Sequence, residues 1–526
     1  MSTIKNGLIA ELERRVADKI LEPTNAELLK KLITNADTDN EAMMIAELGT
    51  TYKRTGLHFD KRLEKMTNDI RYFKKNETLS FHTDDTKPTH KLIIGDNYEA
   101  LQNLLIQYKG MIDVIYIDPP YGKDSMGEFA QTNYENAITR DNLLSMLYPR
   151  LMLAKMLLSD DGIIFTSIDI RNYAYIKCLF DETFGECNSI TTLNWKKKKQ
   201  PSYLSCIASI IEYVLIYSKN SSLIKKLSID SVADSNKPII NASNEVSERI
   251  IRKGIRAKCE QNSIVKGIYT NRTMSIEILD DINIENGRTV NEFRCKAKFR
   301  TGQDNIDKYC EEDLIFITKN IGLRRDLDET EKGKAKAMTD LLLDWGQNQD
   351  GSDEFKEIFD IQDDTTIFDN PKPVLLIENL IKCTMKEEPI VLDFFSGSGT
   401  TGHAVLDLNE KDGGNRTFIL CQLNEVTDTT PNGIAYDVTA KRLKRIMTGE
   451  CYDGTKDFEW IKKNKTYGGN LDVYEIESVA NFETTEKKTP FDVIDETLYG
   501  KEKFATLQEK VEWVCQNFNN TQKTVE

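Results

Sequence analysis

The chain has 526 residues, 39% of them hydrophobic and 29% charged, and a formal net charge of −15. No apolar run approaches the roughly 20 residues that cross a membrane, so we expect no membrane association. Ten scattered cysteines without a C-x-x-C pair and only four histidines argue against a disulfide framework, a metal site and histidine catalysis. Charges throughout the first segment predict that no signal peptide is present and that the location is cytoplasmic.

The beginning of the chain is predicted to be helical. Apolar residues recur at helical spacing from Leu8 to Ile20 and form a second face over 28–33. We expect a small helical or oligomerisation region over 1–85, in which 59–75 is a linker or surface helix.

A strand–helix–strand pattern follows. The sequence predicts a strand over 91–97 that ends in a Gly-Asp turn, a helix over 98–108 and a buried strand over 111–117. Such a unit makes its strands parallel. Further helices are predicted over 139–158 and 172–184, and further strands over 162–168 and 211–217. This alternation predicts a doubly wound, mostly parallel α/β sheet with helices on both faces.

The strand at 111–117 stops at Asp118-Pro119-Pro120-Tyr121. The prolines remove backbone donors and fix φ, so no regular element continues through them. Asp118 and the carbonyl of Pro119 are two acceptors that suit an amino group with two N–H donors, and Tyr121 offers a flat face for a planar base. Ligands bind at the carboxyl ends of strands in open α/β sheets. A plain proline turn capped by Asp118 is the alternative reading.

The regular alternation is lost between residues 220 and 365. Short strand-like runs at 264–269, 275–279 and 314–318 alternate with charged loops. We predict a separate module inserted into the sheet domain.

Regular elements are predicted again after residue 370. A helix begins at the segment Asn370 to Pro373, and a strand over 389–393, a glycine-rich loop and a strand over 416–423 follow. Gly397-x-Gly399 at a helix entry makes a tight turn and lets a ligand approach the backbone. Neither G-x-G-x-x-G nor a phosphate-binding P-loop is present. Gln422 ends the next strand, where a ribose diol would be held. Lys372 is a candidate to neutralise a ligand carboxylate, and a solvated helix cap is its alternative.

The segment from Asp393 to Thr401, Asp-Phe-Phe-Ser-Gly-Ser-Gly-Thr-Thr, resembles the S-adenosylmethionine loop of amino-methyltransferases, and 118–121 resembles their catalytic motif. The order of the motifs resembles the β group of these enzymes, which implies a circularly permuted sheet. Asp as the first motif residue points to N6-adenine rather than N4-cytosine. The size, the helical leader and a tail containing 512–515 resemble the modification subunits of type III restriction–modification systems.

The resemblance implies an adenine-specific DNA methyltransferase with S-adenosyl-L-methionine as cofactor. The catalytic residues would be Asp118, Pro119, Pro120 and Tyr121. The cofactor would be bound by Asp96, Lys372, Asp393, Phe395, Ser396, Gly397, Ser398, Gly399, Thr400 and Gln422. For Asp96 the alternative is a turn-forming role. Gln422 stands where many relatives carry an acidic residue.

The resemblance and the composition together predict five regions. They are a helical region (1–85), the first methyltransferase half (86–220), a target-recognition domain (221–365), the second methyltransferase half (366–440) and a C-terminal region (441–526), a candidate for contact with a second copy or a partner.

A basic segment is the candidate DNA contact. Between Ile190 and Thr270 there are 14 Lys and Arg against 6 Asp and Glu, a balance of +8. Lys196, Lys197, Lys198 and Lys199 would meet phosphates, with a solvated surface run as the alternative. Guanine edges would be read by arginines of the inserted module. The candidates are Arg249, Arg252, Arg256, Arg294 and Arg300, with Arg252 and Arg256 foremost.

Partners follow from the same resemblance. We expect double-stranded DNA, a homodimer and a separate restriction subunit that supplies helicase and nuclease. An apolar stripe runs along a predicted tail helix at Phe504, Leu507, Val511, Val514 and Phe518. It packs either on the chain's own core, which we favour, or on a partner. Rival functions are an N4-cytosine methyltransferase, a silent DNA-recognition subunit, and methylation of RNA or protein.

Overall fold

A computed structural model gives the fold. It describes residues 3–17, 21, 23–48, 69–120, 140–199, 207–229, 236–271, 274–361, 367–480, 489–518 and 521. Among these residues, no helix combines the length and the apolarity needed to cross a bilayer.

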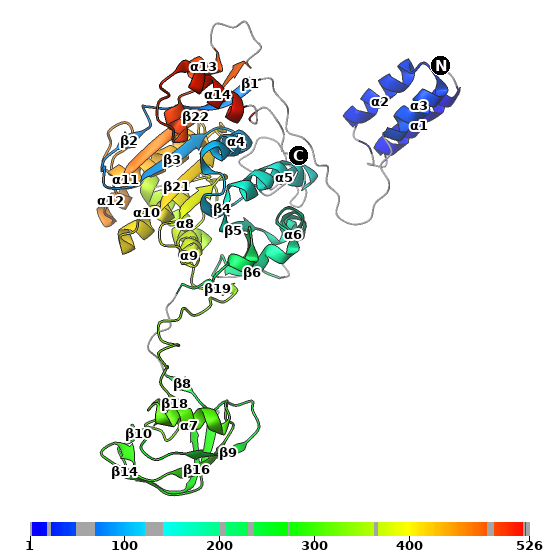
Figure 1. Ribbon diagram of the computed structural model, residues 1–526. Coiled ribbons are helices and arrows are strands. Elements are labelled where there is room, and N and C mark those ends of the chain that lie inside the picture. The colour runs from blue at the N-terminus through cyan, green and yellow to red at the C-terminus, as the bar shows by residue number, and fades with distance from the viewer. Residues whose placement is uncertain are drawn as a thin grey trace.

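The beginning of the chain forms a bundle of α1 (Thr3–Ala17), α2 (Pro23–Asn35) and α3 (Asp39–Leu48). Its small core contains Leu12, Ile33 and Ala42, all fully buried. Figure 1 shows this blue bundle apart from the main body. The helical prediction for this stretch is confirmed.

The central sheet has the strand order β1-β22-β3-β21-β20-β4-β5-β7-β6-β19, and β2 pairs with β22. Its strands are β1 (Asp69–Lys75), β2 (Phe81–His82), β3 (Thr89–Ile94), β4 (Ile112–Ile117), β5 (Leu158–Ile168), β6 (Ser189–Lys196), β7 (Ile211–Ser218), β19 (Leu341–Leu342), β20 (Ile390–Asp393), β21 (Thr417–Gln422) and β22 (Asn470–Ala480). All neighbours from β22 to β5 are parallel, whereas β7 runs antiparallel to β5 and β6. The predicted mostly parallel sheet is confirmed.

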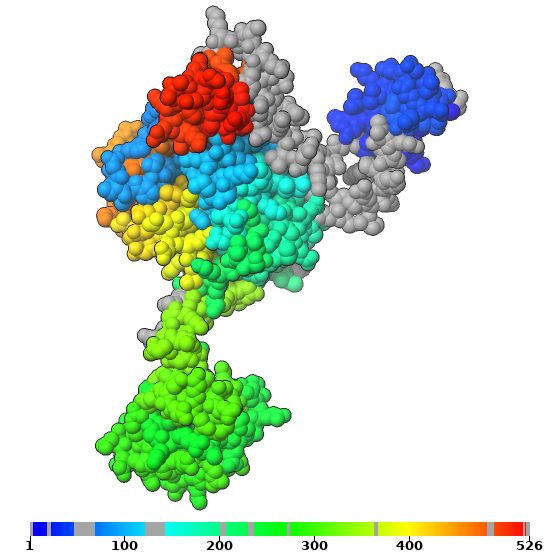
Figure 2. All heavy atoms as spheres, viewed as in Figure 1, coloured from blue at the N-terminus to red at the C-terminus, as the bar shows by residue number. Residues whose placement is uncertain are grey.

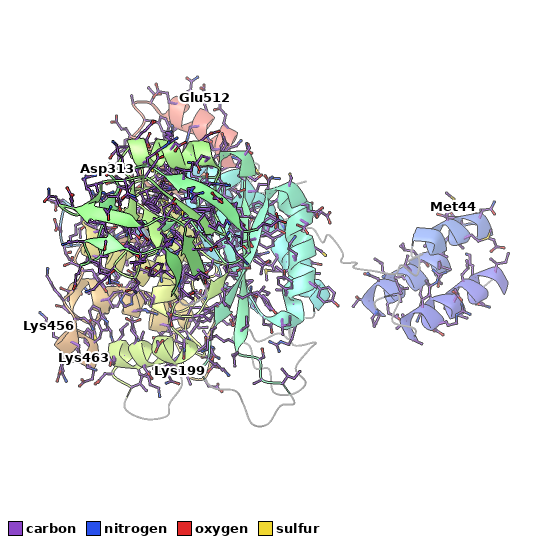
Figure 3. All side chains as sticks on the ribbon, turned by 90° about the horizontal axis from the view of Figure 1, so that it is seen from below. Met44, Lys199, Asp313, Lys456, Lys463 and Glu512 are labelled. Atoms are coloured by element: carbon purple, nitrogen blue, oxygen red, sulfur yellow. The ribbon has the colours of Figure 1, made fainter. Side chains whose placement is uncertain are left out.

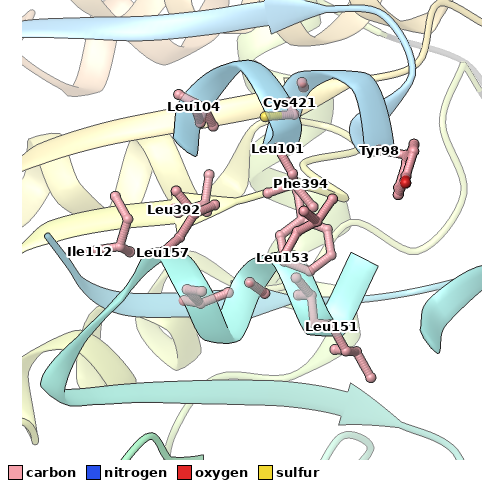
Figure 4. Packing of buried hydrophobic residues seen from close by; sticks show 14 of the residues in the cluster. Tyr98, Leu101, Leu104, Ile112, Leu151, Leu153, Leu157, Leu392, Phe394 and Cys421 are labelled. Carbon is pink, nitrogen blue, oxygen red and sulfur yellow. The ribbon is translucent and has the colours of Figure 1, made fainter. Parts of the chain in front are cut away.

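Helices cover both faces of this sheet because its strands are apolar on both sides. Ile115 and Ile117 of β4 belong to one buried cluster, and Val114 and Tyr116 belong to the other. The first cluster takes most of its helical residues from α4 (Asn97–Tyr108), α5 (Arg140–Leu157) and α6 (Ile170–Phe184). The second takes them from α8 (Asn348–Phe359), α9 (Val374–Lys382), α10 (Thr400–Asp412), α11 (Lys441–Thr448) and α12 (Glu459–Lys463). Figure 4 shows leucines of α4 and α5 gathered around Leu392 of β20. The chain is therefore a doubly wound α/β protein.

The inserted module has its own core. Its strands are β8 (Lys237–Pro238), β9 (Ser247–Ile251), β10 (Arg256–Ala257), β11 (Ser263–Ile264), β12 (Gly267–Asn271), β13 (Met274–Ile278), β14 (Ile282–Glu285), β15 (Arg288–Thr289), β16 (Phe293–Ala297), β17 (Ile315–Ile317) and β18 (Leu323–Arg325). They form two sheets, with α7 (Gln303–Glu311) beside them. A cluster around Phe293, Ile306 and Ile315 is buried within the module. Figure 2 shows it as a body of its own, in green.

One predicted element is wrong. The sequence assigned 59–75 to a linker or surface helix, but 69–75 is the strand β1, and 59–68 lie outside the described residues. β1 pairs along its whole length with β22, antiparallel, although the two are about 400 positions apart along the chain. Its polar composition suits an edge strand, and the partner that makes it a strand is too distant for local patterns to indicate.

The tail packs on the chain's own core. After α13 (Pro490–Val493), the helix α14 (Leu507–Phe518) buries Val514 and Phe518 in the first cluster. The Phe518 ring lies 5.1 Å from that of Tyr499, edge to face. Leu507 is 70% exposed, so only part of the predicted stripe is covered. The favoured interpretation is confirmed for Val514 and Phe518.

We expect Phe518→Ala to lower the free energy of unfolding by about 3–5 kcal/mol, because it leaves a cavity under the tail helix. Leu507→Ala, on the same helix but exposed, is the matched control and should change it by less than about 0.5 kcal/mol. Denaturant titrations of both variants measure these values. Equal small losses would mean that the tail does not contribute to the core.

Candidate active site

Two strand ends that are far apart in sequence lie side by side. β4 and β20 pair in parallel, with Val114 opposite Val391 and Ile115 opposite Leu392. Asp118 follows β4, and the glycine loop follows β20, so both emerge at the same edge of the sheet. The two motifs singled out in the sequence therefore lie at one edge of the sheet.

Asp393 lies at the end of β20 and is buried. Its carboxylate accepts hydrogen bonds from the Phe395 backbone N–H at 3.0 Å and from the Thr401 hydroxyl at 2.5 Å. Burial raises the pKa of Asp393 to about 7, and the nearby Asp118 charge adds to the rise, while the two hydrogen bonds oppose it. A buried acid with a pKa near neutrality is suited to receive a cation.

The loop after Asp393 has left-handed backbone at Gly397 (φ +49°) and Gly399 (φ +80°), which L side chains rarely adopt. The Gly397 N–H donates to Gln422 Oε1 at 2.7 Å, and its carbonyl accepts from the Thr439 hydroxyl at 2.6 Å. Thr439 belongs to a π-helical turn, Ala435–Ala440, that leads into α11. In this structure Gln422 holds the loop, and its predicted ribose contact stays a prediction.

Two serines of the loop differ in their surroundings. Ser398 Oγ lies 3.2 Å from Arg442 Nη1, and the same nitrogen donates to the Thr400 hydroxyl at 3.0 Å. The Ser396 hydroxyl oxygen is buried and has no hydrogen-bond partner within the described parts of the chain. An orphaned hydroxyl at a binding loop is a group that a bound ligand would satisfy.

Arg442 was missed by the sequence predictions. It is buried beneath the loop, and its second Nη lies 3.0 Å from His403 Nδ1. Burial lowers the pKa of Arg442, while the Glu354 carboxylate, 3.7 Å away, opposes that shift. The residue buttresses the loop from below, and nothing in its local sequence indicates this.

The predicted cofactor residue Asp96 caps α4, where it accepts from the Tyr98 N–H at 2.7 Å. It also pairs with Arg150 at 3.0 Å. The next residue, Asn97, donates to the Phe394 carbonyl at 2.8 Å and so ties this turn to the glycine loop. The turn-forming alternative for Asp96 is thus present, and its contact with a cofactor stays a prediction.

Asp118 lies beside an unexpected pair. Lys372 Nζ is 3.1 Å from Asp118 Oδ2 and 2.6 Å from Glu212 Oε1. Lys372 is only 9% exposed, so the solvated helix cap is excluded. Its predicted contact with a ligand carboxylate remains untested, because the ammonium group here meets carboxylates of the protein. Pro119 is buried and Pro120 half-buried, and Tyr121 lies outside the described residues.

The four lysines predicted to contact DNA differ in how exposed they are. Lys196 is half-buried, Lys197 pairs with the buried Glu212, and Lys198 and Lys199 are exposed. Figure 3 shows Lys199 on the surface. These positions leave the last two lysines as the best phosphate contacts of the run.

The foremost arginine candidates are engaged inside the module. Arg252 pairs with Asp307 at 3.0 Å, and Arg256 pairs with Asp326 at 2.7 Å. Both arginines keep exposed surface, and ion pairs of this kind contribute little to stability, so the pairs do not exclude base reading. Their contact with DNA stays a prediction. No group of three or more metal-ligating side chains occurs in the described ranges.

Comparisons with known proteins agree with this geometry. A family model described as DNA methylase matches residues 112–429, and a model of an uncharacterised conserved protein matches 8–114. The chain is 33% identical over 400 residues to the Mod subunit of the type III restriction-modification enzyme StyLTI of Salmonella typhimurium, covering 69% of this chain and 58% of the relative. It is 28% identical over 438 residues to the EcoP15I Mod subunit of Escherichia coli, covering 73% and 67%.

A solved structure titled M1.HpyAVI-SAM complex shares 15% identity, covering 67% of this chain and 97% of that one, at a TM-score of 0.29. That score is too low to support any conclusion. The chain spans 58% of the length of the Salmonella relative.

Fold and site define a class: a doubly wound α/β protein whose ligand site joins a glycine loop to an Asp-Pro-Pro strand end. Since the matched model covers more than half of its length, the chain belongs to the DNA methylase family.

Proposed function

We propose that this chain methylates N6 of adenine in double-stranded DNA with S-adenosyl-L-methionine, as the modification and DNA-recognition subunit of a type III restriction–modification system. The observation that carries the proposal is the pairing of β4 with β20, which brings Asp118 and the glycine loop to one edge. Membership of the DNA methylase family and the likeness to Mod subunits support the substrate and the system.

The loop residues fit the cofactor. The ionisable Asp393 suits the ammonium group of the cofactor. The Ser396 hydroxyl, which has no hydrogen-bond partner in the described residues, could bond to a ligand. The two glycines with left-handed backbone let a ligand reach the main chain. The cofactor supplies a sulfonium-bound methyl group that is electrophilic. Asp393, Phe395, Ser396, Gly397, Ser398, Gly399 and Thr400 are the residues that we assign to this site.

The residues after β4 would act on the target amine. An adenine inside a duplex is out of reach, so it must be flipped into the site. There the Asp118 carboxylate and the Pro119 carbonyl accept hydrogen bonds from the two N–H groups of the amine, which makes the nitrogen lone pair more available. Tyr121 is assigned to stack on the flipped base. Positioning and electrostatics then account for the catalysis.

Recognition and partners complete the proposal. We assign phosphate contacts to the exposed Lys198 and Lys199 and base reading to the inserted module. A homodimer, a separate restriction subunit and a cytoplasmic location are proposed from the Mod relatives.

The function is tested with the full chain, methyl-labelled cofactor and duplex DNA, followed by digestion to nucleosides. We expect label in N6-methyladenosine. Label in N4-methylcytosine would replace the adenine assignment, and no label in DNA would refute the proposed function. Exchanging residues 220–365 for those of a relative should move the methylated sequence.

We expect cofactor affinity to rise with pH up to about neutrality. A cation bound beside Asp393 favours the ionised carboxylate and lowers its pKa from about 7, so binding below that pH releases a proton. Calorimetry at pH 6 in two buffers of different ionisation enthalpy measures this release. Asp393→Asn, which cannot ionise, should show none, and a proton release that survives this change would contradict the assignment.

A further inference from the structure

Four charged side chains form a chain beside the Asp-Pro-Pro segment. Lys372 Nζ contacts Asp118 at 3.1 Å and Glu212 at 2.6 Å. The other oxygen of Glu212 lies 3.1 Å from Lys197 Nζ. Glu212 comes from the antiparallel strand β7, while Lys372 comes from the segment before α9. None of the sequence patterns pointed to Glu212.

The backbone around Lys372 is tightly held. A Cβ at Gly351 would lie 2.3 Å from the Pro371 carbonyl oxygen, and one at Gly346 would lie 2.9 Å from Pro373. The Gly346 carbonyl in turn accepts from the Trp195 indole N–H at 2.9 Å. Contacts this close leave the Lys372 backbone little freedom. The ammonium group at the end of the side chain is held by its contacts with Asp118 and Glu212.

The charges along this chain are balanced. Burial raises the pKa of Glu212, but the ammonium groups of Lys372 and Lys197 outweigh it, and the net shift is downward. Burial opposes the charge of Lys372, but Asp118 and Glu212 overcome this effect and raise its pKa. A lysine alone beside Asp118 would cancel its charge and weaken it as an acceptor. Glu212 shares the lysine with Asp118, so the charge of Lys372 is divided between two carboxylates and Asp118 remains an effective acceptor.

We propose that Glu212 and Lys372 form a positioning pair for Asp118. Glu212 holds the lysine, the lysine orients the Asp118 carboxylate and keeps it ionised, and the carboxylate meets the target amine. This inference rests on the proposed function and assigns Lys372 to Asp118 instead of the cofactor carboxylate. Both residues act through Asp118 and have no contact of their own with the reacting atoms.

The test compares Lys372→Met, Glu212→Gln and the double variant with wild type. Lys386→Met is the matched control, because Lys386 also bridges two carboxylates, Asp113 at 2.9 Å and Asp161 at 2.7 Å, at the opposite end of β4. We expect each single variant to lower kcat about 100-fold while the Kd for S-adenosylmethionine stays within about threefold. The double variant should be no worse than the poorer single one, since the pair acts as a unit. Lys386→Met should keep wild-type kcat.

Several results would overturn the inference. One is a cofactor Kd raised tenfold or more in Lys372→Met with kcat retained, which would make Lys372 a cofactor ligand. Effects that multiply in the double variant would also overturn it. That variant removes the buried charges of Lys372 and Glu212 together, so it remains informative if a single variant fails to fold. Lys197 loses the Glu212 carboxylate in Glu212→Gln and in the double variant alike.

A readout independent of methyl transfer separates this inference from the proposed function. If wild type does not methylate DNA, the proposed function fails. Carbon NMR titration of the Asp118 carboxyl then still tests the pair: its pKa should rise by about one unit or more in Lys372→Met. An unchanged pKa would overturn the inference.

Discussion

Asp118→Ala should abolish methyl transfer to DNA, with kcat reduced by about 10³-fold or more, while the cofactor still binds. The change removes an acceptor aimed at the amine on which charge develops, and such groups are worth about 10²–10³-fold each. It also removes the Asp118 carboxylate from beside Lys372, which keeps its contact with Glu212 at 2.6 Å, so the site loses one negative charge. Labelled methyl transfer measures kcat, and calorimetry measures cofactor binding.

Asp113→Ala is the control for this prediction. Asp113 lies at the other end of β4, where it accepts from Lys386 at 2.9 Å and from the Ile390 N–H at 3.0 Å. Its loss should cost stability, about 1–3 kcal/mol, but leave kcat near that of wild type. Full activity in Asp118→Ala would disprove the acceptor role.

Gly397→Val should weaken cofactor binding by about 100-fold or more. A β-branched residue at φ +49° is strained, and its Cβ would lie 3.0 Å from the Phe368 ring. Relief of this strain must move the loop and break the bonds that Gly397 makes with Gln422 and Thr439. The Kd for S-adenosylmethionine, measured by calorimetry, reports the displacement.

Gly413→Val is the control that separates the effect of backbone strain from the effect of a displaced glycine loop. Gly413 has φ +72°, lies just beyond the far end of α10 and would place a Cβ with nothing within 4 Å. It carries the same kind of backbone strain, about 1–2 kcal/mol, away from the loop. This variant should lose stability and retain cofactor affinity. Equal loss of affinity in both variants would contradict a local role for Gly397.

Much of the fold was predictable because its signals are local. The apolar run before Asp118 and the strand–glycine–helix pattern after Asp393 each depend on neighbouring residues. The parallel arrangement follows from the alternation of strands and helices. The predicted helices and strands of the sheet domain match the observed ones within a few residues, as at 98–108 against Asn97–Tyr108.

The remaining features depend on contacts between distant residues. Glu212 lies in an ordinary apolar strand, and its role appears only when Lys372, 160 positions later, comes beside it. In the sequence, Arg442 is one of several basic residues in a helix, and only the structure shows that it is buried under the glycine loop. Likewise, β1 is polar and becomes a strand only through β22. For Arg252 and Arg256 the sequence predicted contacts with DNA bases, and only the structure shows that Asp307 and Asp326 pair with them.

The contact between Glu212 and Lys372 also has a consequence for how such chains diversify. The polypeptide leaves the sheet after β7 and rejoins it at β19, whereas Glu212 lies at the start of β7 and Lys372 lies just before α9. The ion pair therefore joins two segments of the sheet domain that come before and after the insertion. The module between β7 and β19 can be exchanged while this pair and the catalytic edge stay in place. Hybrid proteins joined in the connections to the module, with Glu212 and Lys372 taken from one parent, should acquire a new DNA specificity without losing turnover.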